Sequence, residues 1–148
     1  MYRSFRSLAI AFSLALLVSG GVYAQVHKFF SPGTIWTVTA IQMKAGMDQA
    51  YLEYLDGQFK KESDAQVKAG YMKSYKVLRT LDDQAGGWNM LLLREYASLA
   101  SMEANEEKSD TLAAQLIGND QAQMAGYTDR SKIREVMWTK TAREYMLK

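Results

Sequence analysis

The sequence has 148 residues, enough for one domain with a hydrophobic core. It contains no cysteine, which excludes a disulfide framework, a thiolate nucleophile, an iron–sulfur cluster and a thiolate zinc site. It carries 18 basic and 16 acidic side chains, and removal of the two arginines in the first 24 residues would leave 16 of each. A neutral domain lacks the positive field that nucleic acid or anionic lipid requires.

The first 24 residues have the pattern of a secretory signal peptide. Arg3 and Arg6 form a basic start, residues 8–18 form an apolar run, and residues 22–24 offer the small residues that signal peptidase recognises. A membrane span is the alternative, but it needs roughly twenty apolar residues. We therefore expect cleavage after Ala24, export to the periplasm or outside a bacterial cell, and no membrane attachment afterwards.

The predicted mature chain opens with a flexible leader over residues 25–33, which contains the only proline, and continues as one domain over residues 34–148. Residues 34–44 are rich in threonine and β-branched side chains and predict a first strand. Its two sides both carry apolar groups: Ile35, Thr37, Thr39, Ile41 and Met43 against Trp36, Val38 and Ala40.

An amphipathic helix is predicted from Met47 to about Gly70. Its apolar residues recur at helical spacing, and charged residues occupy most of the opposite side. Asp48 in the first turn favours a helix N-terminus, and Gly70 favours its end. Gly57 in the interior costs about 1 kcal/mol relative to alanine, which is typical of a position that packs closely against a neighbour.

Two strands joined as a hairpin follow. Residues 71–81 form the first, residues 82–87 the turn, and residues 87–96 the second. The second has apolar groups on both sides: Trp88, Met90 and Leu92 against Leu91 and Leu93. Such a strand needs cover on both faces and belongs inside a sheet. A short helical turn is the alternative, but the segment lacks a 3.6-residue period.

The following segment predicts helix and then a break. Leu99 and Met102 indicate a helix after the third strand. Ser109 or Asp110 is predicted to cap a second helical piece, which Gly118 closes.

The remainder predicts a polar connection over residues 119–129 and a long final strand over residues 131–147. The resulting order is strand, helix, strand, strand, helix, strand, which is the ferredoxin-like α+β arrangement. Its helices lie on one face of a four-stranded antiparallel sheet. The other face would expose several hundred square ångströms of apolar surface, so we expect a second copy packed face to face on it.

A strand runs through a Lys-x-Gly turn into a helix over residues 38–47, and the junction at 69–71, the Gly-Trp pair at 87–88 and the opening of the last strand at 133–136 are similar in character. On these features, residues 34–148 resemble the dimeric α+β-barrel superfamily, which includes antibiotic-biosynthesis-type monooxygenases and NIPSNAP-like proteins. Such features specify a fold and not an activity.

The resemblance implies a pocket between helices and sheet that takes a small aromatic or polycyclic compound, or haem. Haem-degrading members use a histidine as axial ligand, and the only histidine here is His27, in the predicted leader. No haem and no other cofactor is therefore expected. Cofactor-independent oxygenases of the superfamily rely on pocket Asn, Trp, Tyr, Arg or His, but no motif assigns such a role here.

No catalytic or metal-binding pattern is evident. The sequence has no Gly-x-Gly-x-x-Gly and no phosphate loop. His27 near a new N-terminal amine is a candidate metal ligand, yet a metal site needs several positioned donors, so none is predicted. A Ser–His–Asp triad lacks its histidine. The carboxylate pairs 82–83 and 106–107 fit a solvated turn and helix end better than acid–base catalysis.

Seven residues are candidates for ligand binding: Trp36, Tyr54, Tyr75, Trp88, Asn89, Arg94 and Trp138. The aromatic ones fit a core and a dimer interface, or a pocket beneath the helices for a flat ligand. Arg94 and Arg143 lie on predicted strands and need an acidic, carbonyl or anionic partner. A structural partner such as Glu95, Glu135 or Glu144 is favoured.

The sequence therefore predicts an exported homodimeric domain that binds a small aromatic or apolar molecule or a partner protein, without an evident catalytic constellation. The alternative is a cofactor-independent monooxygenase acting on a phenol- or quinol-like substrate. That alternative rests on the resemblance alone.

Overall fold

The computed structural model describes residues 29–81 and 87–148. They belong to two compact units: residues 34–144 form one, and residues 29–33 and 145–148 belong to the other. The predicted signal peptide, His27 and the carboxylate pair 82–83 lie outside the described residues. In the part described, no helix combines the length and apolar character needed to cross a bilayer.

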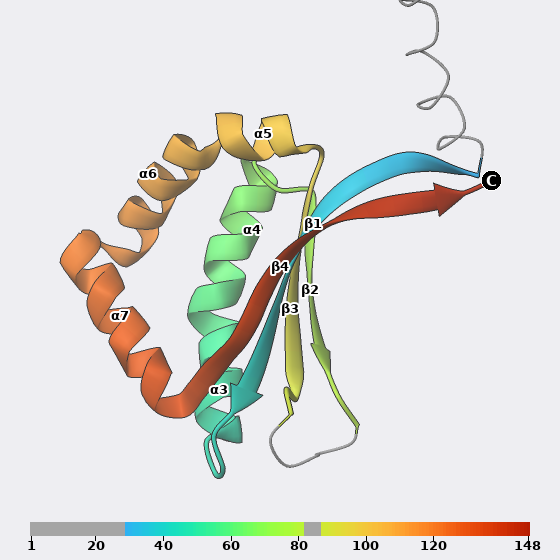
Figure 1. Ribbon diagram of the computed structural model, residues 1–148. Helices are drawn as coiled ribbons and strands as arrows, with labels where there is room; N and C mark the ends of the chain where they lie inside the picture. The colour runs from blue at the N-terminus through green and yellow to red at the C-terminus, as the bar shows by residue number, and fades with distance from the viewer. Residues whose placement is uncertain (1–28, 82–86) are drawn as a thin grey trace, which may run out of the picture. The chain divides into compact units, whose positions relative to one another are not determined.

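Four strands form one sheet: β1 (Phe30–Met43), β2 (Ser74–Arg79), β3 (Met90–Tyr96) and β4 (Arg134–Leu147). Their order in the sheet is β2-β3-β1-β4, and β3 runs antiparallel to both β1 and β2. The helices lie on one side of this sheet (Figure 1). This arrangement confirms the predicted ferredoxin-like α+β fold.

The pairing register assigns side chains to the two faces of the sheet. Opposed residues share a face because side chains alternate with a period of two. Ile41 opposes Met90, and both lie on the face that the helices cover. Val38 opposes Leu93 and therefore shares with it, and with Trp36, the other face, which we call the open face.

The predicted helix runs without a break from Asp48 to Lys68. It comprises α3 (Asp48–Tyr54), a π-helical turn η1 (Leu55–Phe59) and α4 (Lys60–Lys68). Gly57 lies in the π turn, and a Cβ there would meet no atom within 4 Å. The expectation that Gly57 marks close packing is therefore wrong, because the residue faces outward.

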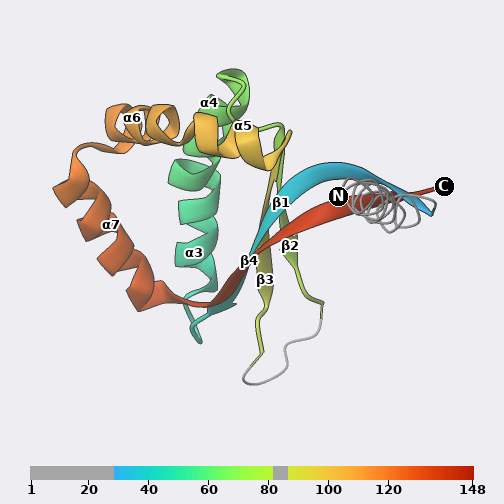
Figure 2. The same ribbon diagram turned by 45° about the horizontal axis from the view of Figure 1, so that its top comes forward.

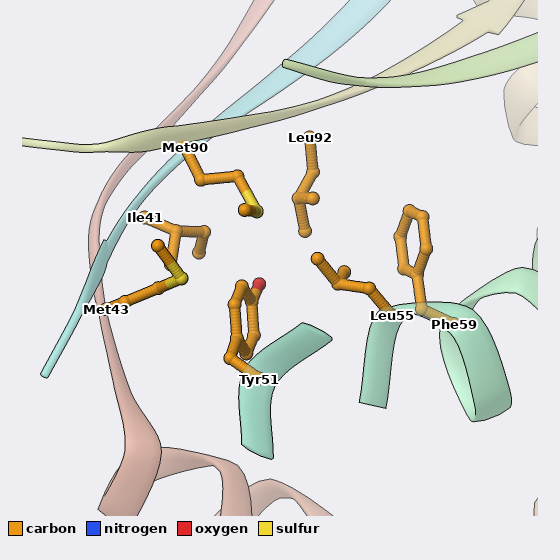
Figure 3. Close-up of a cluster of buried hydrophobic side chains, with 7 residues drawn as sticks. All are labelled: Ile41, Met43, Tyr51, Leu55, Phe59, Met90 and Leu92. Atoms are coloured by element: carbon orange, nitrogen blue, oxygen red, sulfur yellow. The ribbon is translucent and has the colours of Figure 1, made fainter. Parts of the chain in front are cut away.

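The π turn aligns the apolar face of this helix with the sheet. Tyr51, Leu55 and Phe59 are spaced four apart, a spacing that drifts by about 40° per step on a regular α-helix. A π turn has more residues per helical turn, so each residue rotates less about the axis and the drift becomes smaller. All three side chains consequently reach the core, where they pack against sheet residues (Figure 3): Ile41, Met43, Met90 and Leu92.

The segment after β3 contains two helices before Gly118. Ser98 caps α5 (Leu99–Ala104), with the Ser101 N–H donating to the Ser98 hydroxyl at 3.0 Å. The next helix, α6, spans Glu106–Ile117, and the Ser109 N–H already donates to the Asn105 carbonyl at 2.8 Å. The prediction that Ser109 or Asp110 caps this helix is wrong, because the helix begins a turn earlier.

A third helix, α7 (Asp120–Ile133), replaces the predicted connection over residues 119–129. Asn119 caps it by accepting a bond from the Ala122 N–H at 3.1 Å. The segment is polar because none of its residues is buried. In both views α6 and α7 lie outside the α3–η1–α4 helix, with α6 contacting α4 and α7 contacting α3 (Figure 2).

The ends of the sheet also differ from expectation. β4 begins at Arg134 and not at Ser131, and β1 begins at Phe30, so residues 30–33 of the predicted leader are strand. In the smaller unit, the Phe30 ring stacks on Tyr145 with centroids 3.9 Å apart. The predicted leader therefore includes part of the sheet's outermost pairing.

Phe59→Ala should lower the free energy of unfolding by about 3–5 kcal/mol, because it leaves a cavity at the centre of the core. Urea denaturation followed by tryptophan fluorescence measures the loss. Leu52→Ala, on the outer side of α3 with 43% of the side chain exposed, is the control and should change stability by less than about 0.5 kcal/mol. Equal losses in both variants would contradict the core assignment.

Candidate functional site

Three of the predicted site residues gather on the helix-covered face around Phe59. The Tyr54 ring lies 6.5 Å from the Phe59 ring, and the Tyr75 ring meets it edge-on at 5.7 Å. The Arg94 guanidinium carbon lies 5.2 Å from the same ring. The Tyr75 hydroxyl donates to Asp64 Oδ1 at 2.7 Å, so its polar end has a protein partner.

Two of the predicted tryptophans lie on the open face. Trp36 shares that face with Val38 by alternation along β1. The Thr139 hydroxyl lies 3.1 Å from that of Thr39, which belongs to the helix-covered face, so the preceding residue, Trp138, points to the open face. The predicted residues are therefore divided between the two faces and cannot line one pocket within a single chain.

Trp88 and Asn89 lie where the chain enters β3, and their roles differ. Trp88 is 38% exposed. The Asn89 side-chain oxygen accepts the Met43 N–H at 2.9 Å, and the Asn89 N–H donates to the Ile41 carbonyl at 2.9 Å. Asn89 thus holds the end of β1 against the start of β3, and its amide oxygen is engaged.

A cavity of about 300 Å³ lies where α7 leads into β4, and we call it the α7–β4 cavity. It is lined by side chains from α7, β4 and the turn after β1: Lys44, Tyr127, Ser131, Arg134, Glu135 and Val136. This volume is at the lower end of the range for small-molecule sites. None of these residues was a predicted ligand contact: the sequence predicts Tyr127 in a connection and the others on the first and last strands.

Two arginines stack on aromatic rings beside this cavity. The Arg134 guanidinium carbon lies 5.7 Å from the Tyr51 ring, and that of Arg130 lies 5.2 Å from Tyr54 and 6.0 Å from Tyr127. Among residues 29–81 and 87–148, the Nε atoms of both arginines are buried without a hydrogen-bond partner. Each guanidinium thus lies over a tyrosine ring, while its Nε has no hydrogen-bond acceptor in the described part of the chain.

Tyr51 places a second unpartnered group in the same region. Its side chain is fully buried, and its hydroxyl has no hydrogen-bond partner in the described part of the chain. Burial raises the pKa of Tyr51 from 10.0 to about 12, while Arg134, Arg130 and Arg94 act in the opposite direction. The hydroxyl therefore lies in an apolar core that is also within a positive electrostatic field.

The favoured structural partners of Arg94 are engaged elsewhere. Glu95 accepts bonds from Ser74 at 2.5 Å and Lys73 at 3.1 Å, which lower the pKa of its carboxyl group. Glu144 accepts a bond from Thr34 at 3.1 Å.

Arg94 instead lines a cavity of about 200 Å³ together with three carboxylates of α5 and α6, those of Glu103, Glu106 and Asp110. It forms no ion pair with any described residue. Arg143 likewise forms no ion pair with a residue that the structure describes. The prediction of a structural carboxylate partner for these two strand arginines is therefore wrong. Glu95 and Glu144 bond to nearer donors, and Glu135 forms no ion pair with a described residue and lines the α7–β4 cavity.

Within the described ranges, no three His, Cys, Asp or Glu side chains are grouped so that they could hold a metal ion. Signals for the α7–β4 cavity did exist in the sequence. Asn119 followed by Asp120 is a helix start, and Tyr127 and Arg130 have the three-residue spacing of one helix side, with Arg134 at the first position of the following strand. Reading that spacing would have placed Tyr127 and Arg130 together.

The sequence matches no protein-family model and no curated protein. Solved structures resemble the fold. A dimeric ferredoxin-like protein from an uncultured marine organism is 13% identical, with a TM-score of 0.50 over 80% of this chain and 98% of its own. A second, from the same kind of source, is 10% identical, with a TM-score of 0.51 over 78% and 90% of the two chains.

A NIPSNAP family protein of unknown function from Agrobacterium tumefaciens is also similar, at 8% identity and a TM-score of 0.46 over 78% of this chain and 90% of its own. At these identities the first two similarities establish the ferredoxin-like fold and nothing about activity.

Tyr51→Phe should leave the free energy of unfolding near neutral pH unchanged or slightly higher, because it removes a buried hydroxyl without a protein partner. At high pH the two proteins should diverge. The unfolded tyrosine ionises near 10 and the folded one near 12, so wild-type stability should fall by roughly 2 kcal/mol more than that of the variant across that interval. Denaturant titrations from pH 8 to 12 measure this. A loss above about 1 kcal/mol at pH 7 would show that the hydroxyl has a partner.

Proposed function

We propose that this chain is an exported homodimeric domain that binds a small molecule in the α7–β4 cavity. The observation that carries the proposal is a cavity lined by Arg134 and adjoined by Arg130, two arginines whose buried Nε atoms have no acceptor among the described residues. A buried polar group without a hydrogen bond costs free energy, and more so when it is charged. A bound ligand that accepts from these groups would remove that cost.

The open face of the sheet supports the homodimer. Trp36, Val38, Leu91 and Leu93 are only partly covered there in the single chain, and Leu78 is 48% exposed. Contiguous apolar surface of this kind marks an interaction site. The two marine ferredoxin-like structures, with TM-scores of 0.50 and 0.51, are described as dimeric, and a second copy packed sheet to sheet about a two-fold axis would cover this face.

Leu93→Glu should convert the protein from dimer to monomer, because it places a charge at the centre of the proposed interface. The protein is purified from the periplasm of a bacterial host that exports it through residues 1–24, and intact mass reports whether that segment was removed. Light scattering then measures assembly. Leu52→Glu, on the outer side of α3, should remain dimeric, and circular dichroism checks that both variants fold. A wild-type particle with the mass of one processed chain would refute the dimer.

Ligand binding should appear as a rise in the thermal midpoint with a panel of small aromatic molecules, because a ligand that binds only the folded state stabilises it by mass action. The panel includes neutral and charged members of similar size. Arg143→Gln, on the exposed part of β4 outside the cavity, is the control and should keep the response. No response from any member would count against the proposal.

The alternative function, a cofactor-independent monooxygenase acting on a phenol or quinol, has no observation in its favour beyond the resemblance. Asn89, a residue type on which such enzymes rely, has its side-chain oxygen bonded to the Met43 N–H. Oxygen uptake with phenols and quinols, at a rate above that of Trp88→Ala and Asn89→Ala, would establish this alternative in place of simple binding.

A further inference from the structure

We propose that the ligand of the α7–β4 cavity is a small aromatic molecule carrying one carboxylate, which the N–H edges of Arg134 and Arg130 bind. This inference rests on the proposed function, because it names the chemical class that the same site would take. Its four supports are the charge of the site, the orientation of the guanidinium groups, the glycine beneath one of them, and the helix end beside them.

The charge at the cavity is unbalanced. Lys44, Arg134 and Glu135 line it, and Arg130 stacks on the lining residue Tyr127. None of the three cations forms an ion pair with a described residue. Two cations and one carboxylate line the cavity, and Arg130 adds a third positive charge beside it, so an anion entering the cavity meets a net positive field.

The chain forms ion pairs nearby where it can. On α7 itself, the Lys132 ammonium donates to Asp129 Oδ1 at 2.7 Å, on an exposed part of the helix. Asp129 precedes Arg130 in sequence yet is taken by Lys132. The helix therefore supplies no carboxylate to the arginines, although an acidic residue lies next to one of them in the chain.

Each of the two guanidinium groups lies over a tyrosine ring, and that contact limits its orientation. Arg134 lies over Tyr51, and Arg130 lies over Tyr54 and near Tyr127. A guanidinium stacked on its face presents its N–H groups in the plane, where a carboxylate binds with both oxygens. The buried Nε of each arginine belongs to such an edge and has no acceptor in the described chain.

Gly126 makes room for this arrangement. A Cβ at position 126 would lie 3.1 Å from Nη1 of Arg130, closer than an ordinary contact. Glycine within a helix costs about 1 kcal/mol relative to alanine. The helix thus carries a destabilising residue at the position over which the Arg130 guanidinium folds back.

The end of α7 favours a singly charged ligand. The helix ends at Ile133, and the partial negative charge of its C-terminus acts on the same region as Glu135. Both weaken the positive field that offsets desolvation of a bound anion, and a phosphate with about −1.5 to −2 charges costs more to desolvate than a carboxylate with one. Cations also stabilise a helix C-terminus directly, but that role needs only their charge and leaves the buried Nε atoms unexplained.

The cavity also limits the body of the ligand. About 300 Å³ is the lower end of the range for small-molecule pockets, and Tyr127 and Val136 offer apolar contact in it. A single aromatic ring bearing a carboxylate meets both the size and the charge.

Isothermal titration of the exported dimer with benzoate, benzamide and phenyl phosphate tests the inference. Benzoate should bind, benzamide of the same shape should bind at least about tenfold more weakly, and phenyl phosphate should also bind more weakly than benzoate. Arg134→Gln should weaken benzoate binding by about tenfold or more, and Arg134→Lys by less, because lysine keeps the charge without the bidentate edge. Arg143→Gln makes the same change of charge outside the cavity and should bind benzoate as the wild type does.

Gly126→Ala separates binding from folding. Alanine should raise the thermal midpoint of the unliganded protein through its helix propensity, while it displaces the Arg130 guanidinium and weakens benzoate binding. Wild-type benzoate affinity in this variant would overturn the role of Arg130. Benzoate binding by Gly126→Ala therefore tests the inference even if Arg134→Gln fails to fold.

The remaining outcomes distinguish this inference from the proposed function. Benzamide binding as tightly as benzoate, or unchanged benzoate affinity in folded Arg134→Gln, would overturn the carboxylate while small-molecule binding stands. Tighter binding of phenyl phosphate would overturn the preference for a single charge. Absence of binding by any neutral or anionic aromatic would overturn both.

Discussion

The packing of one helix against the β1–β3 pair is the constraint on which the rest of the structure depends. Tyr51, Leu55 and Phe59 reach the sheet together because the π turn keeps residues spaced four apart on one side. Opposite them, Ile41 and Met90 share a face because they are directly paired. A short helical irregularity and a strand register therefore act together to close the core.

That core also explains the two unlike surroundings of the aromatic residues. Tyrosines on the helix lie beside arginines, because α7 packs on α3 and brings Arg130 to Tyr54. Two tryptophans, Trp36 and Trp138, lie on the open face, where the Lys76 ammonium lies 5.4 Å from the Trp36 ring and no described helix forms a layer. The helix-covered side thus has arginine N–H groups without an acceptor in the described chain, and the open face has apolar side chains that are only partly buried. The first supports the proposed ligand site, and the second supports the proposed homodimer.

The bonds of the strand arginines and glutamates depend on which side chains lie on the same face of the sheet, and not on how many opposite charges are available. Glu95 bonds to Ser74 and Lys73, which reach it across the β2–β3 pair. Arg94, one residue before it, points to the other face by alternation and meets the Phe59 ring instead. Neighbours in sequence on a strand cannot pair across the sheet, and for this reason the expected partners were unavailable.

The sequence by itself determined the strands, the first long helix and the ferredoxin-like order, because alternation in residues 34–44 and 87–96 and helical spacing in residues 47–70 are local signals. It missed α7, whose polar residues carry little apolar period since the helix is not buried. It also predicted Tyr54 and Arg94 as site residues but not the side chains that contact them, Arg130 and Phe59. Only the tertiary structure decided that Arg130 and Arg134 lie at Tyr54 and Tyr51, because that proximity depends on how α7 packs on α3. Residues some eighty positions apart leave no trace of such a contact in a single sequence.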